Sequence, residues 1–329
     1  MTSFTWTSSS NSSWDTGTHW NTGSAPDSFS ADATIAAPGT YTVSILGGHS
    51  FELDSLALND QGAGLNLAGT LDLSGGSGNV IDDLLGSNFP YGAGTIELDG
   101  GTLFGATTIT ALVTTTTTGT IDGPAGRLTT NENGNLEADS GGVLLIDTAG
   151  TFDSDGYITA SSGTVVVNPQ TDAIVIGGSA LVGDNVYLVE GGTVDFGGSL
   201  TADLATITTN ASGDEDIIHL IGPGAVMAGW NGSTYVPIQQ TLGSIGANAQ
   251  LLLTVGQDFA DPNTLTVDGT VGVGDATLAA AALVVNPDGT LSGLGSSGTA
   301  GLVSAPVDND GTILVSGSIE IANAIAGSG

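Results

Sequence analysis

Basic residues are almost absent from this chain. Lys and Arg together number 1, which is Arg127, against 34 Asp and Glu, and the formal net charge is -33 at pH 7. Proteins bind nucleic acids and anionic membranes by placing Lys and Arg against their phosphates, so this charge excludes both classes of partner. The imbalance also favours an exported protein, because a chain with one Lys or Arg offers trypsin-like proteases one cleavage site.

Cysteine, long apolar runs and a signal peptide are missing as well. With 0 Cys the chain has no disulfide, no thiolate nucleophile and no Cys-ligated metal site. The most apolar stretch, Ala276 to Val285, is about half the length of a membrane span. The first residues have neither the charged nor the apolar region of a secretory signal. We expect an extracellular or cell-surface protein exported without a classical N-terminal signal peptide; a mature exported chain and a cytosolic protein are the alternatives.

The composition that is present favours strands and turns. Hydrophobic residues make up 40% of the chain and the mean hydropathy is +0.25, so the acidic chain has enough apolar side chains to fold. These are mainly Val, Ile, Leu and Ala, accompanied by 53 Gly and by abundant Thr and Ser. β-branched residues between glycines are typical of short strands joined by tight turns.

A short motif, Gly-Thr followed by an apolar residue, recurs along the sequence. Spacings of 25 residues separate Gly69, Gly94 and Gly119, and spacings of 20 and 22 separate Gly269, Gly289 and Gly311. These distances suit one coil of a solenoid. Around the motif apolar and polar residues alternate, which predicts strands with one buried face. The sequence therefore predicts an all-β fold, a parallel β-helix, with glycines at corners that need positive φ.

The first 40 residues differ from the rest. They hold Trp6, Trp14 and Trp20 among Ser, Thr and Asn, before regular strand patterning begins. We divide the chain into residues 1–40, a Trp-rich N-terminal cap or docking segment, and residues 41–329, the repeat body. A cap would cover the open core of the solenoid, whereas clustered Trp side chains also form interface anchors.

The chain resembles a known class of proteins in these regions. The residues that carry the resemblance are Thr5-Trp6, Trp14, Trp20-Asn21, Pro26-Asp27, Ala33-Thr-Ile, Pro38-Gly-Thr-Tyr-Thr-Val, Ser55-Leu-Ala-Leu and Leu65-Asn-Leu-Ala-Gly-Thr-Leu. In them the sequence is similar to secreted bacterial β-helix proteins of the autotransporter-passenger and large-adhesin kind. The resemblance implies a right-handed parallel β-helix, surface display, adhesion or matrix formation, and no active site. The C-terminal membrane barrel of a complete autotransporter has no counterpart here.

Enzymatic activity is the main alternative, because β-helices also include polysaccharide lyases and hydrolases. Lyases of acidic sugars need Arg or Lys to stabilise a carbanion, and this chain has one such residue. Hydrolases need only paired carboxylates, for which Asp82 with Asp83 and Asp153 with Asp155 are candidates. With 34 acids such pairs also arise by chance, so we expect no enzyme and assign no catalytic residue.

Calcium is the favoured ligand, because it binds oxygen donors from Asp, Asn and turn carbonyls. Candidate ligands occur in three short acidic clusters, with diffuse counterion binding as the alternative. They are Asp153 and Asp155, Asp214 and Asp216, and Asp308 and Asp310.

Self-association is the function that the ends of the chain favour. The segment Ser316 to Ala326 is apolar and strand-like, and unpaired solenoid edges can continue a ladder between subunits. The residues expected to mediate assembly are Trp6, Trp14, Trp20, Ile319, Ile321 and Ile325. We predict an extracellular structural or adhesive surface protein that assembles end to end into filaments or a biofilm matrix. Its partner is itself or a cell-surface glycan ligand; the alternative is a polysaccharide-binding or polysaccharide-hydrolysing β-helix protein.

Overall fold

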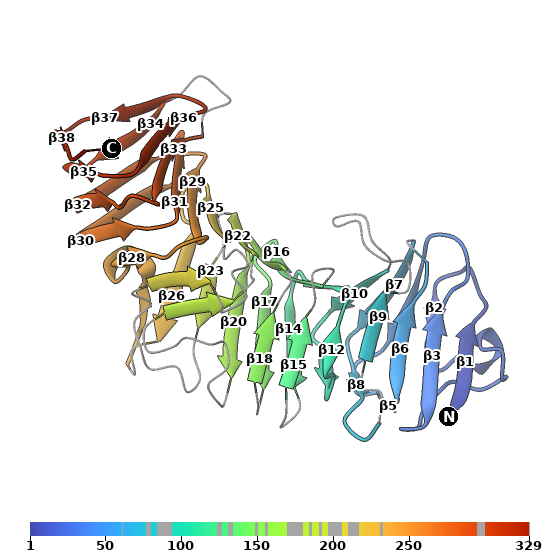
Figure 1. Cartoon of the computed structure of the whole chain (residues 1–329). Coiled ribbons are helices and arrows are strands. Elements are labelled where there is room, and N and C mark those ends of the chain that lie inside the picture. Colours follow the sequence, from blue (N-terminus) through green and yellow to red (C-terminus); the bar gives the residue numbers. More distant parts are fainter. Residues whose placement is uncertain are drawn as a thin grey trace. The chain divides into compact units, whose positions relative to one another are not determined.

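The computed structural model describes most of the chain as strands (Figure 1). The described residues are 1–60, 62–76, 80–83, 94–123, 127–130, 134–148, 151–154, 157–169, 180–183, 186–190, 193–196, 206–209, 217–230, 233–294 and 300–328. They form two compact units, one of residues 1–158 and 163–173 and the other of residues 159–162 and 174–329. The expected all-β parallel solenoid with an N-terminal cap is confirmed.

In the N-terminal unit, each coil contributes strands in turn to three parallel sheets. The first sheet contains β1 (Thr2–Trp6), β3 (Ala31–Ile35), β6 (Ser55–Leu58), β9 (Val80–Asp83), β12 (Thr108–Ile109), β15 (Arg127–Thr130) and β18 (Thr151–Ser154). The second contains β2 (Ser12–Ser13), β4 (Tyr41–Ile45), β7 (Ala63–Leu67), β10 (Thr95–Leu98), β13 (Leu112–Thr115) and β16 (Asn135–Asp139). The third contains β5 (Ser50–Glu52), β8 (Thr70–Asp72), β11 (Thr102–Phe104), β14 (Thr118–Gly123), β17 (Val143–Thr148) and β20 (Thr164–Pro169).

The C-terminal unit is built in the same manner. One sheet of this unit contains β22 (Val186–Glu190), β25 (Ile217–Ile221), β29 (Gln250–Thr254), β31 (Thr270–Gly274), β33 (Thr290–Gly293) and β36 (Thr312–Val315). A second contains β21 (Ala180–Gly183), β24 (Thr206–Thr209), β28 (Ser244–Ile245), β30 (Asp258–Val267), β32 (Thr277–Val285), β34 (Gly301–Ser304), β35 (Val307–Asn309), β37 (Ile319–Ile321) and β38 (Ile325–Ala326). The other described strands are β19 (Tyr157–Ser161), β23 (Thr193–Phe196), β26 (Val226–Trp230) and β27 (Tyr235–Pro237), of which β26 and β27 pair antiparallel.

Helix is scarce in the described part of the chain. It consists of two short 3-10 helices, η1 (Gly17–His19) and η2 (Ile238–Gln240). No helix among the described residues is long and apolar enough to span a membrane.

Columns of apolar side chains fill the interior of each unit. In the third sheet of the N-terminal unit Leu71, Leu103 and Ile121 pair from coil to coil, and all three are fully buried. The neighbours of a buried residue along its own strand face outward. The strands β4 and β7 show this alternation, because buried and half-buried residues follow one another along each of them. Every second residue of a strand therefore points into the coil and is apolar, as the sequence predicted.

The Gly-Thr motif lies at or near the start of a strand, and only some of its predicted spacings are coil repeats. Thr270, Thr290 and Thr312 pair in register, so the 20- and 22-residue spacings are true coil repeats. The prediction that 25 residues make one coil between Gly69, Gly94 and Gly119 is wrong. In the third sheet Thr70 pairs with Thr102, and Thr102 pairs with Thr120. Thr95 lies in the second sheet.

The role predicted for the motif glycines is also corrected. Positive φ occurs at other glycines, such as Gly100 at 81°, but not at Gly69, Gly289 or Gly311. At Gly69 an added Cβ would meet the backbone carbonyl oxygens of His49 and Leu46 in the preceding coil. The motif therefore requires glycine because successive coils approach too closely for a side chain.

The N-terminal end is closed by a cluster of tryptophans. Trp6 and Trp14 are fully buried and Trp20 is 2% exposed. The ring of Trp20 meets those of Trp6 and Trp14 edge to face, with centroids 5.2 and 4.8 Å apart. Each indole N–H donates to a backbone carbonyl, that of Ser8, Pro26 or Trp14. The cap interpretation explains these side chains, whereas insertion of their rings into a partner would require the cap to open.

Segments of this cap occupy the first strand edges. On β1, the Thr5 N–H donates to Oδ1 of Asn21 at 2.9 Å, and the Thr7 N–H, just beyond the strand, donates to the His19 carbonyl. On β5, the Glu52 N–H donates to Oδ1 of Asp27 at 3.1 Å and its carbonyl accepts from Ser28. The cap also continues the ladder of the body, since β3, which lies within residues 1–40, pairs in parallel with β6.

Candidate functional site

A repeated acidic turn forms one corner of the C-terminal unit. β31, β33 and β36 each begin with Thr, and each Thr is preceded by Asp-Gly. Because the three Thr residues pair in register, Asp268, Asp288 and Asp310 recur at the same corner of successive coils. We call these three residues the acidic corner.

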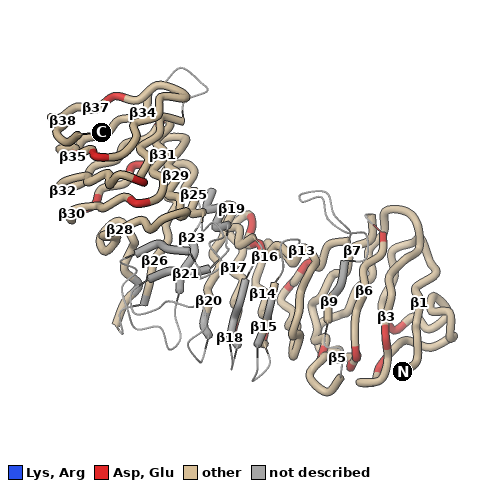
Figure 2. Tube along the Cα trace, viewed as in Figure 1, with Lys and Arg blue, Asp and Glu red and all other residues tan. Residues whose placement is uncertain are grey.

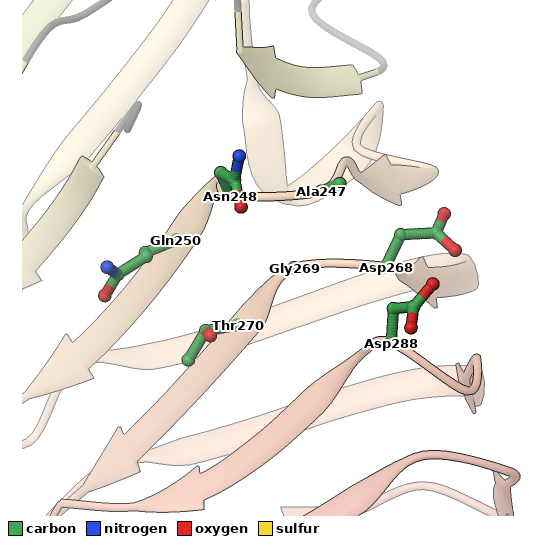
Figure 3. Close-up of a pocket in the computed structure, with 7 residues that line it drawn as sticks. All are labelled: Ala247, Asn248, Gln250, Asp268, Gly269, Thr270 and Asp288. Carbon is green, nitrogen blue, oxygen red and sulfur yellow. The ribbon is translucent and has the colours of Figure 1, made fainter. Parts of the chain in front are cut away.

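A shallow groove of about 340 Å³ lies along part of this corner. Figure 3 shows the carboxylates of Asp268 and Asp288 side by side, pointing the same way from adjacent coils. The residues that line the groove are Ala247, Asn248, Gln250, Asp268, Gly269, Thr270 and Asp288. The side chains that line it offer amide, hydroxyl and carboxylate groups, which suit a hard cation or the hydroxyl groups of a sugar.

Local hydrogen bonds fix two carboxylates of the acidic corner. The Asn286 amide donates to Oδ1 of Asp268 at 2.7 Å, which holds the turn between β32 and β33 against the preceding coil. The N–H and hydroxyl of Ser328 donate to Oδ1 of Asp310 at 2.8 and 2.6 Å. Because these donors stabilise the charged form, the pKa of Asp310 lies below its usual value.

The predicted calcium ligands fall into three situations. Asp308 and Asp310 are exposed on either side of the buried Asn309, at β35 and the turn after it. Asp153 lies on β18, in a strand whose backbone alone is described. Asp155, Asp214 and Asp216 lie outside the described residues. In the described part of the chain, no group of three or more His, Asp or Glu side chains is arranged to hold a metal ion.

The residues predicted for assembly separate into two groups. Trp6, Trp14 and Trp20 lie inside the cap, as described above. Ile319, Ile321 and Ile325 lie on β37 and β38 in the last coil, where Ile325 is 55% exposed. The three isoleucines lie on strands, and their role in assembly stays a prediction.

The Gly-Thr motif by itself does not identify the residues that line the groove. The signal was the Asp that precedes the motif, since Asp-Gly-Thr occurs at 268–270, 288–290 and 310–312. Acidic residues are otherwise spread over many strands and turns, as Figure 2 shows for both units. Because acidic residues occur throughout the sequence, the acidic repeat at one corner can be recognised only when the pairing of the coils is known.

The fold and this corner define the class: an all-β parallel solenoid with an oxygen-rich acidic groove. No protein-family model, no curated protein and no solved structure matches the chain.

Proposed function

We propose that this protein is an extracellular structural or adhesive element of a cell surface, which associates with its own kind through a solenoid end. The observation that carries the proposal is the construction of each unit as closely stacked coils. The outward positions hold Thr, Ser, Asp and Asn, while the inward columns are apolar. Such a body supports a long polar surface without requiring an active site.

The charge supports an extracellular location. A net charge of -33 keeps separate molecules in solution and repels polyanions, and Ca²⁺ is the natural counterion for so many carboxylates outside cells. We propose calcium as a ligand of the acidic corner and of Asp308, without assigning a coordination geometry.

Fractionation of the source cells tests the location. Immunoblots of culture supernatant, washed intact cells and lysate are compared, with a cytosolic enzyme as the control for lysis. The proposal predicts intact chain in the supernatant or released from intact cells by mild washing. Recovery only together with the cytosolic marker would overturn it.

A second candidate function is binding or hydrolysis of a polysaccharide, and the groove with Asp268 and Asp288 favours it. Two carboxylates beside amide and hydroxyl groups are the minimum that glycan hydrolysis requires. This reading predicts glycan binding or turnover by the purified protein that is lost in both Asp268→Asn and Asp288→Asn. If the protein neither binds nor hydrolyses any glycan in a panel of acidic and neutral glycans, this second candidate function is wrong.

A further inference from the structure

One carboxyl group of the C-terminal unit occupies a position that faces the core. On β30 buried and exposed residues alternate from Asp258 to Asp261, and Phe259 and Asp261 are the buried ones. Asp261 is 4% exposed. Within the part of the chain that the structure describes, its Oδ2 is buried and has no hydrogen-bond partner. A buried oxygen without a partner destabilises a fold, and neither the acidic corner nor its groove involves this one.

Burial keeps a proton on this carboxyl group. Desolvation raises the pKa of Asp261, and hydrogen bonds from Asn263 act in the opposite direction. The elements that pack against β30 are β28, β32 and η2, and none of these three described elements contains a titratable side chain. The other acid on β30 is Asp258, which is exposed. The carboxyl group of Asp261 is therefore protonated at a higher pH than that of an ordinary Asp.

The peptide bond that follows Asp261 has a good leaving group. The next residue is Pro262, and this is the one Asp-Pro pair in the sequence. The proline nitrogen belongs to a tertiary amide, and it leaves as a secondary amine that readily accepts a proton. Pro262 is exposed, so water reaches this bond although the carboxyl group beside it is buried.

The ladder is interrupted at this bond. Asp261 pairs with Ala280 of the neighbouring strand β32 (Figure 1). Thr264 pairs with Ala282, and the register shifts between the two pairs. The N–H of Asn263 donates to Oδ1 of Asp261 at 2.7 Å, which holds the carboxyl group beside the backbone that follows it. Because Oδ1 is engaged, Oδ2 is the oxygen that is free to react.

We propose that the chain cleaves its own peptide bond between Asp261 and Pro262 when the medium is acidified. Oδ2 of Asp261 forms a bond to the backbone carbonyl carbon of the same residue, and the bond from that carbon to the Pro262 nitrogen breaks. The nitrogen keeps the electron pair of the broken bond and takes the carboxyl proton. Water then opens the cyclic anhydride at Asp261 and leaves two carboxyl groups. This step is independent of the proposed function.

The cleaved chain should stay assembled, because β32 pairs with β30 on both sides of the bond. It contacts Asp258 to Asp261 before the bond and Thr264 to Val267 after it. The fragments 1–261 and 262–329 should therefore separate under denaturing conditions and elute together in native size-exclusion chromatography. Separate native elution would contradict this continued pairing.

Incubation of the full chain at neutral and mildly acidic pH tests the cleavage, with denaturing electrophoresis and mass spectrometry as the readout. Circular dichroism identifies acidic conditions in which the chain stays folded. We expect a fragment that begins at Pro262 to form about tenfold faster, or more, in the folded chain than in the urea-unfolded chain at the same pH. Equal rates would overturn the proposal, since the dipeptide alone would then explain the cleavage. A folded chain that stays intact in acid would overturn it as well.

Substitutions identify the reacting group. Asp261→Asn should abolish the acid-dependent cleavage, because the amide has no acidic proton to transfer. Asp261→Glu keeps the carboxyl group but displaces it from its own carbonyl carbon, and should slow the cleavage about tenfold or more. Asp258→Asn is the matched control, since it removes an exposed carboxylate from the same strand, and it should be cleaved as the unaltered chain is. Unchanged cleavage of Asp261→Asn, or an equal loss in the control, would contradict the proposal.

Discussion

The indole N–H of Trp20 donates a hydrogen bond to the backbone carbonyl of Trp14 at 2.8 Å, while the two rings meet edge to face. Both side chains are almost fully buried, so one contact supplies apolar burial and satisfies a buried donor. This pair holds the segment that covers the first strand edges.

Trp20→Ala should therefore destabilise the N-terminal unit severely. Truncation of a buried Trp costs about 3–5 kcal/mol, because it leaves a cavity. Urea unfolding followed by circular dichroism measures the change, and Leu46→Ala, at a half-exposed position, serves as the control. Similar losses in the two variants would show that the tryptophan cluster does not hold the cap.

The close approach of coils predicts opposite outcomes for two nearby glycines. Gly69→Ala places a methyl group against the carbonyls of His49 and Leu46 and should cost about 1–3 kcal/mol. Gly64→Ala is the matched control, because the nearest atom to its Cβ would be Oγ1 of Thr42 at 3.7 Å, an ordinary contact. Thermal unfolding of the two variants measures the difference, and equal melting temperatures would refute the packing argument.

These glycines show how far the sequence could lead. The alternation of apolar and polar residues was sufficient to predict strands with one buried face, and the recurrence of the Gly-Thr motif at intervals of 20–25 residues favoured a solenoid. Neither pattern could show which Gly-Thr motifs stack. Gly94-Thr95 and Gly69-Thr70 look alike in sequence but begin strands in different sheets. Coil lengths vary with the turns, so register depends on backbone pairing that no fixed spacing encodes.

Stacked acids predict that mild acidification stabilises the protein. Asp122 pairs with Asp147 on the next coil, and burial together with this neighbouring charge raises the pKa of Asp122. A carboxyl group whose pKa is higher in the folded state binds its proton more tightly there. Stability therefore increases as the pH falls through the raised pKa toward the unfolded value of about 3.9.

Asp122→Asn should raise the melting temperature at pH 7, because it removes one member of the repelling pair. The gain should shrink as the pH approaches the unfolded pKa of about 3.9, where Asp122 itself is protonated. Calorimetry across this pH range measures the effect. A substitution that lowered the melting temperature at neutral pH would show that the charge of Asp122 is stabilising.

Calcium binding predicts a difference between two divalent ions. If the acidic corner and Asp308 bind calcium specifically, Ca²⁺ should raise the melting temperature more than Mg²⁺ at equal ionic strength, because Mg²⁺ loses its hydration shell reluctantly. The difference should diminish in the double variant Asp268→Asn with Asp288→Asn, measured by thermal unfolding. Equal effects of the two ions would mean diffuse counterion binding.

The candidate site was less accessible to sequence reasoning than the fold. Asp308 and Asp310 were found because they lie close together in the chain, and the structure places both on the outside of the last coils. Asp268 and Asp288 are 20 residues apart and become neighbours only because their turns share a corner. A site made from successive coils needs the coil register before its residues can be grouped.

Immunogold electron microscopy of intact cells tests the central claim most directly, because it locates the folded protein without disrupting the envelope. An extracellular structural element predicts gold particles on the outer surface of unpermeabilised cells, or on material between them. Labelling that appears only after permeabilisation would contradict the account.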